Sequence, residues 1–330
     1  MKYRTLGKTG AKISEVGIGT WQLGGADWGD VPEHDALAIL RHSVELGVNF
    51  IDTADVYGSG RSETLIGRFL KETKHKLFVA TKLGRHGDPG WPANFTLETI
   101  RKHTQDSLQR LGVESLFLQQ LHCIPTEEYC KGEVFEHLRT LKREGLIQNW
   151  GVSVESVEEG LICLKHADCA TLQVIYNIFR QKLTDELLPQ AKAKQVGILA
   201  RVPLASGLLA GKFKPGHKFA EKDHRNYNRD GGAFNVGETF AGVPFDKGLV
   251  FAEEIRKILD AAGAAPMPQK ALRWVLDHDE VSTVIPGATK LGQAESNARA
   301  SDLPPLGKDI HQKLRQLYLK EIAAAIRGKY

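Results

Sequence analysis

The stretch that decides the fold runs from residue 116 to residue 153, with LFLQQLH at 116–122, VFEHLRTLKRE at 134–144 and IQNWGVS at 147–153. The first and last segments are short apolar runs, which are typical of buried strands. The middle segment repeats its apolar residues three and four positions apart, which predicts an amphipathic helix. A strand, a helix and a second strand in succession form the repeating unit of a parallel sheet.

The same alternation continues along all 330 residues. Eight apolar runs are predicted as strands: Val16–Trp21, Phe50–Asp52, Leu77–Lys82, Leu116–His122, Ile147–Ser153, Thr171–Asn177, Val196–Val202 and Val281–Ile285. Eight strands, each followed by a helix, favour an α/β fold of the closed (β/α)8 TIM barrel type. An open doubly wound sheet is the main alternative.

Three additions to the eight units are predicted. Residues 3–6 and 12–14 form an N-terminal β-hairpin, residues 205–245 form a long loop after the seventh strand, and extra helices follow at the C-terminal end. A loop of this length usually has a function or is disordered, and we favour an ordered flap over a ligand. No Pro- or Ser-rich linker interrupts the chain, so residues 1–330 are expected to form a single domain.

Composition excludes several classes of protein. A content of 42% hydrophobic and 25% charged residues is that of an ordinary globular chain. The net charge of +4 is too small to indicate a nucleic-acid-binding or polybasic membrane surface. There is neither an N-terminal signal-like apolar segment nor an apolar run of membrane-spanning length, so a cytoplasmic protein is expected. The four cysteines lack C-x-x-C spacing, and no metal site is predicted.

Polar side chains end consecutive predicted strands, where a barrel enzyme carries its active site. Asp52, Lys82 and His122 end the second, third and fourth strands, and Tyr57 follows Asp52 closely. Any one of them could serve packing or capping alone. An acid, a lysine, a histidine and a tyrosine together indicate proton transfer to a carbonyl oxygen.

Each of the four has a role in such a transfer. A phenol has an ordinary pKa of about 10, and a neighbouring ammonium lowers it. We therefore expect Lys82 to lower the pKa of Tyr57, Asp52 to hold Lys82, and His122 to orient the carbonyl. No protein side chain supplies hydride, so the set implies a nicotinamide cofactor.

The motif DTADVYGSGRSE at 52–63, with Lys82 and His122, resembles the aldo-keto reductase superfamily. The resemblance continues nearly end to end through GIGTW at 17–21, GVS at 151–153, Gln173, YN at 176–177, PLASGLLAGK at 203–212 and IPG at 285–287. It implies a (β/α)8 barrel that reduces a small aldehyde, ketone or sugar carbonyl with NAD(P)H, reversibly. The general acid would be Tyr57, supported by Lys82 and Asp52, with His122 positioning the carbonyl.

The resemblance also implies a set of cofactor-binding residues. Ser153 and Gln173 would bond the carboxamide, and the remaining contacts would come from Gly19, Thr20, Trp21, Asp52, Arg201, Pro203, Leu204, Ser206, Gly207, Leu208, Lys212, Gly287, Thr289, Lys290, Gln293 and Asn297. Trp21, Trp28 and Trp91 follow strand ends and are candidates for an aromatic substrate wall.

Four positions depart from the family pattern. Val154 replaces an asparagine that bonds the carboxamide, and Arg201 stands where many members stack a tyrosine on the nicotinamide. Gly287 and Gln293 stand where many members carry lysine and arginine at the adenosine end. These last two replacements weaken the case for a strict NADPH preference, but Thr289 and Lys290, or a basic flap residue such as Lys214 or Arg225, can still meet a 2′-phosphate. NADP(H) therefore stays the favoured cofactor, with NAD(H) as the alternative.

Two other functions are compatible with these residues. Potassium-channel beta subunits resemble this family, so a regulatory protein that binds the nicotinamide is one alternative. An isomerase or aldolase that forms a Schiff base on Lys82 is another. In the favoured interpretation the partner is a small carbonyl or alcohol, with neither nucleic acid nor membrane involved.

Overall fold

Eight parallel strands form a barrel, and their order in the sheet is their order along the chain. The computed structural model describes residues 1–25, 28, 29 and 31–330. The strands are β3 (Ile18–Gly19), β4 (Phe50–Asp52), β5 (Phe78–Leu83), β6 (Leu116–His122), β7 (Ile147–Ser153), β8 (Thr171–Ile175), β9 (Gly197–Arg201) and β10 (Val281–Val284). The predicted (β/α)8 barrel is confirmed, and the open-sheet alternative is excluded by the way the sheet closes.

Closure occurs between the first and last barrel strands. Val16 pairs with Val284 and Gly19 pairs with Gly287, both in parallel. The predicted hairpin, β1 (Tyr3–Thr5) and β2 (Lys12–Ser14), lies at the N-terminal end of the barrel. Its buried apolar side chains share one cluster with inward-facing strand residues: Leu6, Ile13, Phe50, Ala80, Leu118, Leu199 and Ile285. The barrel interior is therefore a packed core below the site.

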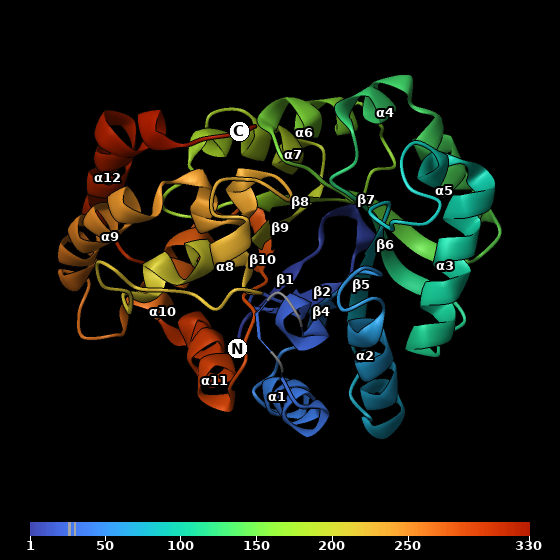
Figure 1. Ribbon diagram of the computed structural model, residues 1–330, viewed down its shortest axis with the longest axis horizontal. Helices are drawn as coiled ribbons and strands as arrows, with labels where there is room; N and C mark the ends of the chain where they lie inside the picture. Colours follow the sequence, from blue (N-terminus) through green and yellow to red (C-terminus); the bar gives the residue numbers. More distant parts are fainter. Residues whose placement is uncertain (26–27, 30) are drawn as a thin grey trace.

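Helices surround the strands (Figure 1) and bury a second, larger apolar layer between themselves and the sheet. They are α1 (Glu33–Glu45), α2 (Arg61–Glu72), α3 (Leu97–Leu111), α4 (Thr126–Lys131), α5 (Glu133–Arg143), α6 (Val157–Cys163), α7 (Leu187–Ala193), α8 (His224–Tyr227), α9 (Phe245–Asp260), α10 (Met267–Leu276), α11 (Leu291–Arg299) and α12 (Lys308–Leu317). In the described part of the chain, no helix combines the length and apolar character needed to cross a membrane.

Residues 205–245, which we call the flap, contain little regular structure. They include three short 3-10 turns, η5 (Ala205–Ala210), η6 (Val236–Glu238) and η7 (Phe240–Gly242), and the single turn α8. The C-terminal tail packs beside the flap, because Arg327 bonds Gly242 and Asp230. The first barrel strand is shorter than predicted, since Trp21 already begins a 3-10 turn, η2 (Trp21–Gly24).

Candidate active site

The four catalytic candidates come together at the C-terminal end of the barrel. Asp52 and His122 are the last residues of β4 and β6, and Lys82 lies near the end of β5. Tyr57 is on the turn between β4 and α2, and its ring meets the His122 ring edge-on with centroids 5.8 Å apart. Parallel pairing of neighbouring strands places these side chains at one rim.

Lys82 links the acid to the tyrosine. Its Nζ donates to Asp52 Oδ1 at 2.6 Å, to the Thr53 carbonyl oxygen at 2.8 Å and to the Tyr57 hydroxyl at 3.2 Å. The three N–H groups of the ammonium thus have three acceptors. Burial lowers the pKa of Lys82, but the Asp52 charge and the hydrogen bonds outweigh it and raise that pKa above its ordinary value. A fully bonded ammonium is not a nucleophile, which counts against a Schiff base on Lys82.

Two glutamines complete the bonding of Asp52. Its Oδ2 accepts from Gln173 Nε2 at 2.7 Å and from Gln120 Nε2 at 3.3 Å. Gln173 was predicted to face the carboxamide, and it does line the cavity, but its amide is directed at Asp52. Gln120 was not predicted. The sequence did carry a signal for it: Gln120 lies two residues before His122, and residues i and i+2 of a strand share a face, so both side chains face the same side of the sheet.

The direction of the Tyr57 pKa differs from the expectation. Lys82 lowers that pKa as predicted, but burial has the larger effect, so the net shift is upward from the ordinary value of 10.0. Tyr57 therefore holds its proton at neutral pH and can act as an acid. The pKa of His122 lies well below its ordinary value because of burial first and then the charges of Arg85, Lys82 and Arg201. A neutral imidazole remains, which can donate one hydrogen bond.

A cavity of about 640 Å³ opens beside these residues. It falls within the size range of about 300 to 1,000 Å³ that is usual for small-molecule sites. Most of the predicted residues line it: Gly19, Thr20, Trp21, Trp28, Asp52, Tyr57, His122, Gln173, Arg201, Pro203, Leu204, Ser206, Gly207, Lys212, Gly287, Thr289, Lys290, Gln293 and Asn297. Residues far apart in sequence thus share one wall.

Four predicted residues lie elsewhere. Lys82 is behind Asp52 and Tyr57, and Leu208 is buried in the core. Ser153 is fully buried, with its Oγ 3.3 Å from Cys123 Sγ. Trp91 is half exposed, and its Nε1 donates to the Gly84 carbonyl oxygen. The structure therefore removes Trp91 from the predicted aromatic wall.

The turn after β9 has an unusual backbone. Val202, Ala205, Ser206 and Gly207 all adopt positive φ, between 48° and 99°. The Ala205 and Gly207 amides donate to the Val202 and Leu204 carbonyl oxygens, which holds the turn tightly against the cavity. Non-glycine residues with a left-handed backbone carry strain, and such strain is found mainly at functional sites. Lys212 follows this turn and also lines the cavity, and its ammonium fits the pyrophosphate of a dinucleotide.

The wall after β10 is built around Gly287. A Cβ at this position would lie 1.9 Å from Gln22 Oε1, so the Gln22 side chain occupies the place of any larger residue. Gln293 Oε1 accepts from the Thr289 amide at 2.7 Å, and Asn297 Nδ2 donates to the Gly287 carbonyl oxygen at 3.3 Å. Lys290 is exposed and borders the cavity. These groups fit a polar adenosine end.

The flap adds His224 and Glu238, which were not predicted, and Arg225, a predicted candidate for a 2′-phosphate, lines the cavity. His224 packs on Trp28 and Trp21, with ring centroids 4.4 Å and 4.8 Å away. Arg225 lies over the Trp28 ring at 4.8 Å. Glu238 lines the cavity and pairs with Arg201. No sequence signal identified His224 or Glu238, because the flap has no periodic pattern that places its side chains.

Comparison with known proteins gives consistent matches. The aldo/keto reductase family model matches residues 15–319. The L-galactose dehydrogenase of Arabidopsis thaliana is 30% identical, over 94% of this chain and 91% of that protein. A probable voltage-gated potassium channel beta subunit of the same plant is 29% identical, over 100% of this chain and 98% of that protein. The solved glycerol dehydrogenase of Gluconobacter oxydans superposes with a TM-score of 0.78 at 30% identity, covering 97% of this chain and 96% of that one.

Proposed function

Because the chain belongs to the aldo/keto reductase family, we propose that it is an NAD(P)H-dependent oxidoreductase that reduces a small aldehyde, ketone or sugar carbonyl to the alcohol, reversibly. The observation that carries the proposal is the bridge from Asp52 through Lys82 to the Tyr57 hydroxyl at a cavity wall. The bridge fixes the Tyr57 hydroxyl and its proton at the wall of a cavity that is large enough for a ligand. The dehydrogenase relatives support the same reaction class, since the reaction runs in both directions.

In this mechanism the nicotinamide supplies hydride to the carbonyl carbon when it is bound. His122, as a neutral imidazole, donates a hydrogen bond to the carbonyl oxygen and orients it. Tyr57 transfers its proton to that oxygen as negative charge develops there. Lys82 stabilises the resulting phenolate, and Asp52 keeps Lys82 charged and in place. The products are the alcohol and the oxidised cofactor.

We propose NADP(H) as the preferred cofactor, with NAD(H) as the alternative. The turn at 202–207 and Lys212 would hold the pyrophosphate, and the wall around Thr289, Gln293 and Asn297 would hold the adenosine. Lys290 is the cavity-lining cation available for a 2′-phosphate at that wall. Fluorescence titration with NADPH and NADH side by side tests the preference, because Trp21 and Trp28 border the cavity and would report occupancy.

A panel of aldehydes, ketones and sugars, assayed with the preferred cofactor, then tests the reaction. We expect turnover of at least one carbonyl and, with the corresponding alcohol and oxidised cofactor, the reverse reaction. The similarity to channel beta subunits favours one second candidate, a regulatory protein that binds the nicotinamide. Tight cofactor binding without turnover of any carbonyl in the panel would favour that candidate instead.

A further inference from the structure

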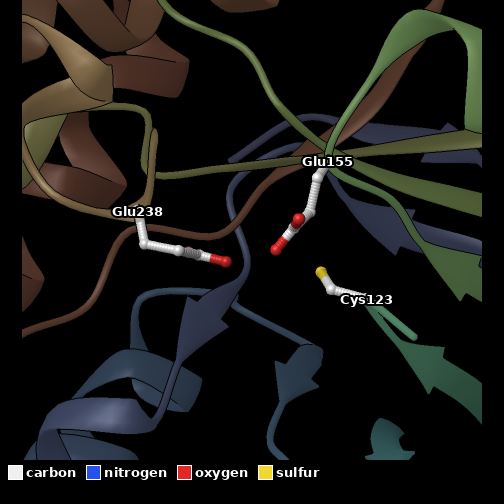
Figure 2. A group of neighbouring side chains, drawn as sticks. All are labelled: Cys123, Glu155 and Glu238. Carbon is white, nitrogen blue, oxygen red and sulfur yellow. The ribbon is translucent and has the colours of Figure 1, made fainter. Parts of the chain in front are cut away.

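Four charged side chains form a network between the flap and the barrel rim. Arg201 at the end of β9 pairs with Glu238 of the flap. Arg85 pairs with Glu155 at 3.0 Å, and Glu155 also accepts from Asn235 of the flap at 3.0 Å. Figure 2 shows Glu238 and Glu155 reaching from separate segments toward Cys123, which follows β6.

Cys123, Glu155 and Glu238 bring their ligand atoms within 4.8 Å of one another, an arrangement that could suit a metal ion. The surroundings argue against one. Each carboxylate already has a guanidinium partner, and Arg201 also donates to Cys123 Sγ at 3.4 Å. Burial raises the pKa of the Cys123 thiol despite the two arginines, which leaves a neutral sulfur. We therefore interpret the group as two ion pairs.

The two pairs differ in their access to the cavity. Arg201 and Glu238 line it, whereas Arg85 and Glu155 are absent from its described lining. Arg201 lowers the pKa of His122 and Glu238 raises that of Tyr57, after the larger effects of burial on both, so the pair lies at the catalytic end. Burial alone would raise the pKa of Glu238, but the charges of Arg201 and Arg85 outweigh it and keep the pKa below its ordinary value. Glu238 is therefore a carboxylate at neutral pH.

Hydride transfer changes the charge at this end of the cavity. The nicotinamide ring is a cation when oxidised and neutral when reduced, and the hydride must leave it close to Tyr57 and His122. The Arg201 guanidinium alone would repel the oxidised ring and leave the reduced ring unaffected. The Glu238 carboxylate offsets this repulsion, because buried charges are only weakly screened.

Resting on the proposed function, we propose that Glu238 is a specificity-determining residue for the oxidation state of the nicotinamide. Its carboxylate balances Arg201, so that the site accepts the oxidised cofactor as well as the reduced one. The flap thereby contributes a charge that allows the alcohol-oxidising direction to start from a bound cofactor. A purely structural ion pair would affect both oxidation states equally.

The test is isothermal titration calorimetry of the full chain with NADPH and NADP+, and with NADH and NAD+. Unit charges about 10 Å apart at an effective dielectric constant of about 20 change an equilibrium constant by about tenfold. We therefore expect Glu238→Gln to raise the ratio Kd(oxidised)/Kd(reduced) about tenfold for both cofactor pairs. Arg201→Met should lower the ratio, and the double variant should return it toward the wild-type value. Glu158→Gln, which removes a carboxylate from an exposed pair with Lys182, is the matched control and should leave the ratio unchanged.

The outcomes separate this inference from the proposed function. An unchanged ratio in Glu238→Gln, with both oxidation states weakened equally, would overturn the inference and show that the pair only holds the flap. A wild-type protein that binds no form of the nicotinamide would overturn the proposed function as well. A tenfold rise in the ratio that the second substitution reverses would establish the charge balance, because misfolding of the flap would weaken the binding of both oxidation states and leave their ratio unchanged.

Discussion

The rim of strand ends and the flap border the same cavity, but they hold their residues in different ways. Asp52, Lys82 and His122 are placed by the parallel ladder, and a buried hydrogen bond joins Lys82 to Asp52 across neighbouring strands. The flap is held by side-chain bonds to its own backbone, such as Ser206 Oγ, which donates to the Glu238 carbonyl oxygen and accepts from the Phe240 amide. The comparison indicates that the proposed chemistry rests on residues that the strand ladder places, whereas the flap supplies side chains that surround the cofactor and substrate.

The largest expected effect follows from the strand-end region. Tyr57→Phe removes the proton donor and keeps the ring that packs beside His122. We expect single-turnover hydride transfer, followed by stopped-flow absorbance, to slow by a factor between about 10² and 10⁴. Cofactor affinity should stay within a few-fold of wild type. An unchanged rate would show that the acid is another group and would break the assignment of chemistry to the rim.

A second prediction concerns Asp55, a buried carboxyl in the same region that accepts no hydrogen bond from a side chain among the described residues. Burial and then the Glu63 charge raise its pKa from 3.8 to about 7. The native state therefore binds the proton more tightly than the unfolded chain, and the contribution to the free energy of unfolding falls as pH rises from about 4 to about 7. Asp55→Asn removes this loss.

Urea unfolding at several pH values measures the effect. The stability of Asp55→Asn relative to wild type should grow by about 3 kcal/mol between pH 5 and pH 8. Asp279→Asn, at an exposed carboxylate, is the control and should show no such trend. If the difference in the free energy of unfolding between the Asp55 variant and wild type stays constant across this range, the pKa of this carboxyl is not raised. The strand-end region would then hold no destabilising buried charge at Asp55.

A third prediction concerns Lys290 at the adenosine wall. Lys290→Met should raise the Kd for NADPH by about fivefold and leave that for NADH unchanged, since an exposed charge-assisted contact is worth about 1 kcal/mol. The difference should shrink as salt is added. Lys313→Met removes an exposed lysine of α12 as the control. Equal effects on both cofactors would show that Lys290 does not meet a 2′-phosphate.

The smallest effect is expected where the C-terminal tail meets the flap. Arg327→Ala removes three side-chain bonds, to Gly242, Asp230 and the Arg229 carbonyl oxygen. We expect hydrogen exchange of residues 228–242 to rise by no more than about fivefold, because exposed pairs contribute little. Exchange in β6 should stay as in wild type. Faster exchange in β6 as well would contradict the conclusion that the flap and the strand ends are held by separate sets of interactions.

The parts of the site that could be predicted depend on local patterns. Periodicity placed seven of the eight strands close to their observed bounds, and the polar strand ends led to Asp52, Lys82 and His122. The Tyr57 pKa was predicted in the wrong direction, because Lys82 is visible in the sequence whereas the burial of the hydroxyl is not. Trp91 follows a strand like Trp21, but its loop carries it to the surface.

The sequence by itself determined the alternation of eight strands with helices, the N-terminal hairpin and the identity of the catalytic candidates, because strand and helix periods and strand-end positions are properties of short segments. Only the tertiary structure decided that the sheet closes into a barrel, which flap residues face the cavity, the pairing of Glu238 with Arg201 and the burial of Asp55. Those features depend on distances between segments that lie far apart in the chain, and on how deeply each charge is removed from water.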